Sequence, residues 1–85
     1  MRIYMQTQYS PEQPLRFYDL QLQPDLLGGW KLIRETGFQG QRGKVTQEYF
    51  QDLNEAEDKL AQRRDMQLKR GYRVVFKEGA TRSPE

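Results

Sequence analysis

The sequence predicts an α+β fold: an antiparallel β-sheet of four to five strands with one amphipathic helix packed on one face, in two layers. Several short segments alternate apolar and polar residues with a period of two, which is typical of half-buried strands. A single segment repeats apolar residues with a helical period. Because helices do not alternate with the strands, a doubly wound nucleotide-binding fold is disfavoured.

The length and composition indicate one small domain, which we expect to cover residues 1–85. Only 35% of the residues are hydrophobic, against roughly 45% or more in an ordinary globular chain. The core must therefore rely on large side chains, and ten aromatic residues can supply them, since each buries on the order of 150 to 250 Å².

Five segments have the strand pattern, and turn-forming residues separate them. Pro24, Gly28 and Gly29 favour a chain reversal after the second segment. Three glycines between residues 36 and 44 indicate a tight, exposed connection after the third. Strands two to four are therefore expected to form an antiparallel meander, and the chain end, residues 78–85, is expected to fray. The predicted strands are residues 2–9, 16–23, 30–35, 45–50 and 72–76.

The alternation also assigns side chains to the two faces of the sheet. Trp30 is in register with Leu32, so we interpret it as a packing residue. Tyr4 and Phe17 occupy the other set of alternate positions. We therefore expect both of them on the face that the helix leaves open.

The predicted helix covers residues 55–70. Ala56, Leu60 and Leu68 recur along one stripe, with the stem of Arg64 between them. We expect this stripe to pack on the sheet.

The ends of the helix have recognisable signals. Asn54 is expected to cap the N-terminus, and Glu57 three residues later can complete a capping-box-like pair. Gly71 supplies the left-handed stop that commonly ends a helix.

The missing residue types narrow the chemistry. The chain has no cysteine and no histidine, which removes thiolate and imidazole metal ligands and the commonest general base. The densest acidic group lies between residues 52 and 58, at the expected helix start, where acids interact favourably with the helix dipole. We therefore expect no enzyme, no cofactor and no metal. No apolar run approaches the length of a membrane span, and a cytoplasmic location is expected.

The net charge of +2 is unevenly distributed along the chain. Residues 31–44 carry four cations against one acid, and residues 63–77 carry six against one, whereas residues 52–59 are acidic. Segregated positive charge attracts phosphates. Basic residues late in a helix can equally serve the helix dipole and solubility, so the glycine loop is the better indication. Its amides, Arg42, Lys44 and Phe38 would suit a phosphate and a base or sugar.

The segment RFYDLQLQPDLLGGWKLIRETGFQGQRGKV, followed by a helix and RGY, resembles the WGR domain family, above all the small stand-alone WGR proteins of bacteria. The likeness covers about residues 16–72 and leaves residues 1–15 outside. It implies an antiparallel sheet with a packed helix, and a module that binds DNA near strand breaks. The Trp-Gly-Arg signature should fall on Thr36, Gly37 and Phe38, so that only the glycine is kept.

Two functions are compatible with these observations. The first is a non-catalytic nucleic-acid-binding module that contacts the DNA backbone through the glycine-rich basic loop with little sequence specificity. The alternative is a protein–protein interaction or accessory module for a DNA-processing partner, which could use an exposed edge strand. The candidate nucleic-acid contacts are Lys31, Arg34, Gly37, Phe38, Arg42, Lys44 and Arg70.

Overall fold

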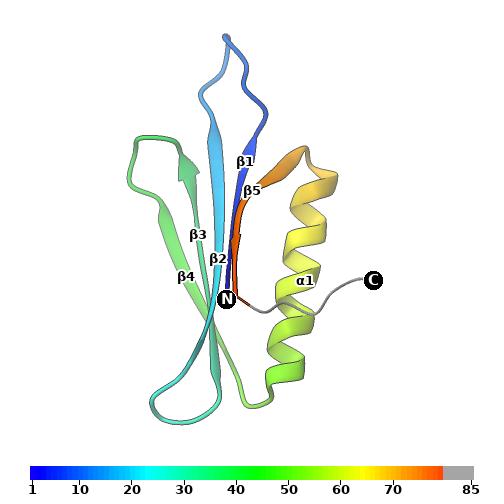
Figure 1. The fold of residues 1–85 in the computed structure, drawn as a ribbon. Coiled ribbons are helices and arrows are strands. Elements are labelled where there is room, and N and C mark those ends of the chain that lie inside the picture. Colours follow the sequence, from blue (N-terminus) through cyan, green and yellow to red (C-terminus); the bar gives the residue numbers. More distant parts are fainter. Residues whose placement is uncertain (80–85) are drawn as a thin grey trace.

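The computed structural model describes residues 1–79 and confirms the α+β class, with five strands and one helix in that part of the chain (Figure 1). The strands form one sheet, and the helix lies between the fourth and fifth strands in sequence. The elements are β1 (Arg2–Thr7), β2 (Arg16–Pro24), β3 (Trp30–Phe38), β4 (Lys44–Phe50), α1 (Leu53–Lys69) and β5 (Tyr72–Glu78).

The sheet has the strand order β4-β3-β2-β1-β5, and every neighbouring pair is antiparallel. The expected meander of the second, third and fourth strands is therefore confirmed. After α1 the chain returns to the edge of the sheet opposite β4, where β5 pairs with β1. Within the described residues, β4 and β5 are the two edges.

The core lies between α1 and one face of the sheet. Ile3 and Met5 of β1, Leu20 of β2 and Leu32 of β3 are fully buried, and Ala56 and Leu60 of α1 pack against them. Burying each large side chain contributes roughly 1.5 to 3 kcal/mol. Trp30 packs against the same cluster, as its register with Leu32 predicted.

The helical stripe differs from the prediction in its second half. Leu68 is exposed, whereas Gln67 is buried together with Ala56 and Leu60. The reason is the pitch of the helix, because each step of four residues advances the stripe by about 40° beyond a full turn. Three such steps carry Leu68 about 120° away from Ala56, while Gln67 returns to within about 20° of it.

The start of the helix was also predicted wrongly. The N-cap is Asp52 and not Asn54: the Asp52 carboxylate accepts a hydrogen bond from the Asn54 backbone N–H at 3.1 Å. Asn54 lies inside the first turn, so the capping box built on it loses its basis. The end of the helix agrees with the prediction, since Gly71 has a φ of +94°.

Four strands are longer than expected, β3 by three residues, β5 by two, and β2 and β4 by one each, whereas β1 ends at Thr7, two residues before its predicted end. β3 continues through Phe38, because Tyr18↔Thr36, Phe17↔Gly37 and Arg16↔Phe38 continue its pairing with β2. The glycine-rich connection therefore shortens to residues 39–43. β5 reaches Glu78, where fraying was expected, and residues 80–85 of that expected tail lie outside the described residues.

Candidate nucleic-acid interface

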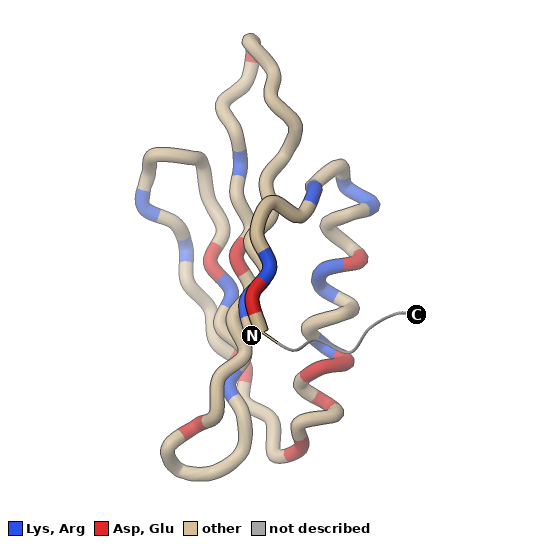
Figure 2. The backbone as a smooth tube through the Cα atoms, in the orientation of Figure 1, with Lys and Arg blue, Asp and Glu red and all other residues tan. Residues whose placement is uncertain are grey.

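A cleft of about 450 Å³ lies between the C-terminal half of α1 and the sheet. We call it the basic cleft, because four of the side chains around it are cationic and none is acidic. Figure 2 shows the corresponding polarity of the helix, with acidic residues concentrated towards its N-terminal end and basic residues towards its C-terminal end. The basic cleft is lined by Tyr18, Arg34, Thr36, Lys44, Thr46, Arg63, Met66, Gln67, Arg70 and Tyr72.

The strand register explains why cations line this side of the sheet. Arg34 follows Leu32 by two residues in β3 and therefore points to the same, helix-covered face. Opposite Arg34 and Thr36, the register of β4 places Thr46 and Lys44 on that face too. The face that is apolar near the start of α1 thus becomes cationic near its end.

Three of the four cations in the basic cleft form no ion pair among residues 1–79. Arg63 is the exception, because its guanidinium donates to Glu48 Oε1 from Nε at 2.8 Å and also from Nη2. Arg34 donates from Nε to Thr46 Oγ1 at 3.0 Å, a neutral partner that leaves its charge uncompensated. Lys44 and Arg70 are exposed and have no acidic partner in the described part of the chain.

Two smaller cavities adjoin the basic cleft and share Tyr72 with it. The first, of about 300 Å³, is also lined by Arg16 and Arg70. The second, of about 280 Å³, is lined by Arg16, Gly37 and Phe38. The Arg16 guanidinium lies 5.1 Å from the centre of the Phe38 ring, which is a cation–π distance. The cationic surface therefore extends from the basic cleft around Tyr72, with two aromatic rings beside it.

The structure brings most of the candidate contact residues together, but not all of them. Arg34, Lys44 and Arg70 line the basic cleft, and Gly37 and Phe38 line the cavity next to it.

Two candidates lie elsewhere. Lys31 is opposite Gln23 and Tyr49 on the open face of the sheet. Arg42 is exposed in the turn after β3 and lines neither the basic cleft nor the two adjoining cavities.

The loop glycines have a packing role. A Cβ atom on Gly43 would lie 2.8 Å from Phe17 Cζ and from the Thr36 backbone oxygen, and one on Gly37 would lie 3.0 Å from the Gly43 Cα. These glycines let the turn close over Phe17 on the open face. Their presence is therefore explained without a bound phosphate.

Sequence reasoning missed Arg16, Arg63 and Tyr72. Arg63 could have been found from the pitch of the helix, since it follows Ala56 by seven residues and returns to the same side. Arg16 and Tyr72 begin strands that are far apart in the sequence, and no local pattern places them beside the same cavity.

A family model described as WGR domain matches residues 1–79. The chain belongs to the WGR family. The match includes residues 1–15, which the resemblance had left outside. No curated protein and no solved structure matches the chain. WGR domains are nucleic-acid-binding modules that are not themselves catalytic, which agrees with the character of the basic cleft.

The positions assigned to the family tripeptide lie at the end of β3 in this WGR domain. Thr36 lines the basic cleft, Phe38 lines an adjoining cavity, and Gly37 lies between them with Phe17 beside it. The strand alternation therefore turns the first and third positions towards the cationic surface.

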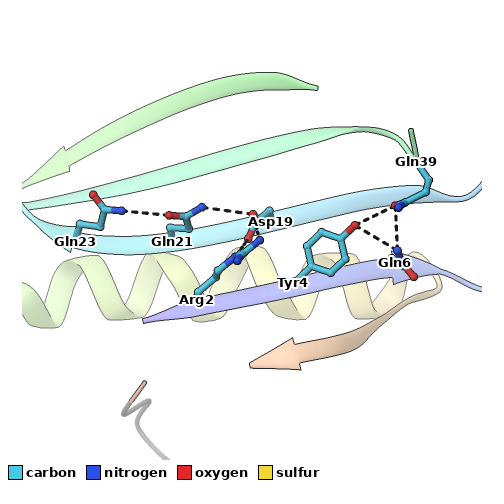
Figure 3. Close-up of polar contacts among 7 residues, drawn as sticks. All are labelled: Arg2, Tyr4, Gln6, Asp19, Gln21, Gln23 and Gln39. Carbon is cyan, nitrogen blue, oxygen red and sulfur yellow. Dashed lines mark hydrogen bonds and ion pairs between the residues drawn. The ribbon is translucent and has the colours of Figure 1, made fainter. Parts of the chain in front are cut away.

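The open face of this WGR domain carries a polar network (Figure 3). Arg2 binds Asp19 through two hydrogen bonds, Nε to Oδ1 at 3.1 Å and Nη2 to Oδ2 at 3.0 Å. The Asp19 carboxylate raises the pKa of Arg2 above its usual value. Tyr4 and Phe17 stack beside this pair with ring centres 6.1 Å apart, so both lie on the open face as expected.

Gln39 connects the turn after β3 to the open face. Its Oε1 accepts hydrogen bonds from the Tyr4 hydroxyl at 3.0 Å and from the Gln6 amide at 3.1 Å (Figure 3). Among the described residues, no group of acidic side chains is arranged to hold a metal ion, and no helix is long and apolar enough to cross a membrane.

Proposed function

We propose that this WGR domain binds nucleic acid, DNA above all, by contacting the sugar–phosphate backbone with the basic cleft. The observation that carries the proposal is the convergence of Arg34, Lys44 and Arg70 from three separate segments with no carboxylate among the cleft-lining residues. Lys and Arg neutralise phosphates and release their counterions, which drives association at low salt.

Two aromatic residues complement the charge. Phe38 is partly exposed at the end of β3, and Tyr72 lines all three cavities around the cationic surface. Aromatic rings next to a basic groove stack on bases or sugars without reading their identity. Contacts of these two kinds fix the position of a strand but carry little sequence information. The proposed binding is therefore largely independent of sequence.

The proposal moves the contact surface from the glycine-rich loop to the cleft beside it. Gly37 and Gly43 serve the packing of the turn, whereas Lys44 at the end of that turn faces the basic cleft. As in its family, we propose that the domain acts by contact and without catalysis. A cytoplasmic site of action is compatible with such a partner.

A titration tests this proposal with one variant and one matched control. Fluorescence anisotropy would measure the binding of labelled single-stranded DNA, duplex DNA and RNA at about 50 and 200 mM salt. Arg70→Gln removes a cation from the basic cleft, and Arg42→Gln removes one from the exposed turn outside it. Both variants lose one charge from side chains that are exposed, so the fold should tolerate them equally.

We expect the wild-type domain to bind at low salt, Arg70→Gln to bind several-fold more weakly, and Arg42→Gln to bind almost as the wild type. Absence of binding to all three probes at low salt would refute the proposed function. A larger loss for Arg42→Gln than for Arg70→Gln would place the contact on the turn.

A protein partner is the alternative, and one surface favours it. Leu26 and Leu27 are almost fully exposed in the turn between β2 and β3. Leu27 borders a cavity of about 480 Å³ that is also lined by Trp30 and Tyr49. Exposed apolar residues of this kind mark protein interaction sites. The alternative predicts that Leu26→Ser and Leu27→Ser abolish capture of a partner while nucleic-acid binding stays unchanged.

A further inference from the structure

The edge strand β4 has an uninterrupted, unshielded outer side. Its inner side pairs with β3 at seven consecutive positions, from Trp30↔Phe50 to Thr36↔Lys44, without a bulge. No strand of the described residues lies on its outer side. Val45 and Tyr49 are 53% and 64% exposed on the open face of the sheet. Such an edge is a template for another strand, because its outward backbone groups have no partner in the sheet.

The opposite edge is protected. The pairing of β5 with β1 shifts register between Tyr4 and Met5, which are opposite Phe76 and Val74. Val75 is the extra residue of this bulge. Bulges bend and twist an edge strand and so discourage pairing with another chain. Natural sheets protect their edge strands with bulges, prolines or charged side chains. β4 has no bulge and no proline, and its two charged residues both point to the helix-covered face.

We propose that β4 pairs with β4 of a second copy of this chain, antiparallel and centred on Gln47, to form a continuous sheet across a two-fold axis. Residues directly opposite each other in a sheet point to the same face. A continuous sheet that keeps both open faces on one side must therefore place odd positions opposite odd positions. Centring on Gln47 satisfies this condition and uses all seven residues of the strand, since Lys44 and Phe50 then face each other.

The side chains of β4 complement themselves in this register. On the open face, Val45 lies opposite Tyr49 of the second copy, twice, on either side of the central Gln47 pair. Aromatic and β-branched residues in directly opposite positions form favourable cross-strand pairs. The two exposed apolar residues of the edge thus cover each other.

The two charged residues of β4 lie on the helix-covered face. Thr46 lies opposite Glu48 of the second copy, and the diagonal neighbours of that glutamate are Lys44 and Glu48 of the first copy. Arg63 of the same copy neutralises each Glu48 carboxylate through two hydrogen bonds to Oε1, which reduces the repulsion between the two diagonal glutamates. No like charges face each other directly in the proposed pair.

The two-fold axis runs perpendicular to the sheet, so both helices lie on the same side of the dimer. The two basic clefts then face the same direction and can contact one nucleic-acid molecule together. This consequence rests on the proposed function, whereas the dimer itself does not. Two linked sites raise the effective concentration of the second contact and so the overall affinity.

The absence of cysteine from the sequence allows a direct test without nucleic acid. Gln47→Cys places two thiols opposite each other on the two-fold axis, where the distance between Cα atoms in a strand pair permits a disulfide. Val75→Cys, exposed on the other edge, is the matched control. We expect mild oxidation to convert Gln47→Cys into a covalent dimer at least about tenfold faster than Val75→Cys, with wild-type dimers seen by sedimentation equilibrium.

A charge pair tests the register. Val45→Lys places a cation opposite Tyr49 of the second copy at both symmetry-related positions and should weaken dimerisation about thirtyfold, as expected for two cross-strand pairs worth about 1 kcal/mol each. Adding Tyr49→Glu should restore it, because lysine and glutamate then face each other twice. The proposal is overturned if the wild-type protein stays monomeric up to about 1 mM, if Val75→Cys crosslinks as fast as Gln47→Cys, or if the double variant is weaker than Val45→Lys.

Discussion

In the proposed binding mode, the salt dependence of binding counts the cations that contact phosphate, and the basic cleft offers three of them. The perturbation is the triple variant in which Arg34, Lys44 and Arg70 are each replaced by glutamine. These three are the cations of the basic cleft without an acidic partner in the described part of the chain, whereas Arg63 is neutralised by Glu48. Each phosphate contact contributes about 0.9 to the slope of log affinity against log salt on duplex DNA, and about 0.7 on single strands.

Three contacts therefore amount to about 2.7 in this slope on a duplex and about 2.1 on a single strand. Between 50 and 200 mM salt, such slopes correspond to a loss of affinity of roughly fortyfold and twentyfold. The triple variant should lose most of this dependence, and the part that remains should come from Arg16 beside the adjoining cavities. Its stability should fall only by about 1 to 2 kcal/mol, because the replaced groups are polar and partly or fully exposed and one hydrogen bond, from the charged Arg34 guanidinium to the Thr46 hydroxyl, is removed.

A second triple variant provides the control for net charge. Glutamine replaces Lys31, Arg42 and Lys77 in this control, which therefore loses as many positive charges as the cleft variant, but from side chains outside the basic cleft. Anisotropy titrations at four or more salt concentrations give the slope for each protein, and thermal melts monitored by circular dichroism show that each is folded. If the control variant loses as much of the slope as the cleft variant, binding follows net charge and the role of the basic cleft is refuted.

Two further predictions concern stability and can be measured by urea denaturation. Gly28 and Gly29 both have positive φ, but only at Gly29 would a Cβ collide with a backbone atom, 2.5 Å from the Phe50 oxygen; Gly29→Ala should therefore cost roughly 1 to 3 kcal/mol more than Gly28→Ala, and equal costs would contradict this packing. Arg2→Ala leaves the buried Asp19 carboxylate without its guanidinium and should cost about 1 to 3 kcal/mol. Asp19→Asn should cost less, since the Arg2 side chain is 42% exposed and can be hydrated; the reverse order would argue against a buried-charge effect.

The architecture was largely readable from the sequence because local patterns determined it. Alternation placed all five strands, and positive-φ glycines marked the turn at Gly28 and Gly29 and the helix end at Gly71. The element ends were less readable. Asp52 and Asn54 are both good N-cap residues, and only the actual start of the helix decides between them.

The candidate site was only partly readable, because it forms where distant segments meet. Alternation within β3 separates Lys31 from Arg34, but it does not say which face the helix covers at that end of the sheet. Lys44 and Arg70 are 26 positions apart in the numbering, and their convergence depends on the phase of α1. In the prediction from the sequence, the buried side of α1 was assumed to repeat every four residues and to end at Leu68. This assumption assigned the wrong side of the helix to the sheet, so the residues that α1 contributes to the basic cleft were missed.

A chemical-shift map is the most direct test of the claim that the basic cleft binds nucleic acid. The measurement is a titration of ¹⁵N-labelled protein with a short blunt DNA duplex and with a single strand of the same length, followed by amide shifts. The account predicts that the largest shifts cluster at Arg34, Thr36, Lys44, Arg70 and Tyr72, around the basic cleft. Shifts confined to the open face around Tyr4 and Gln21, or to the turn at Leu26, would contradict it.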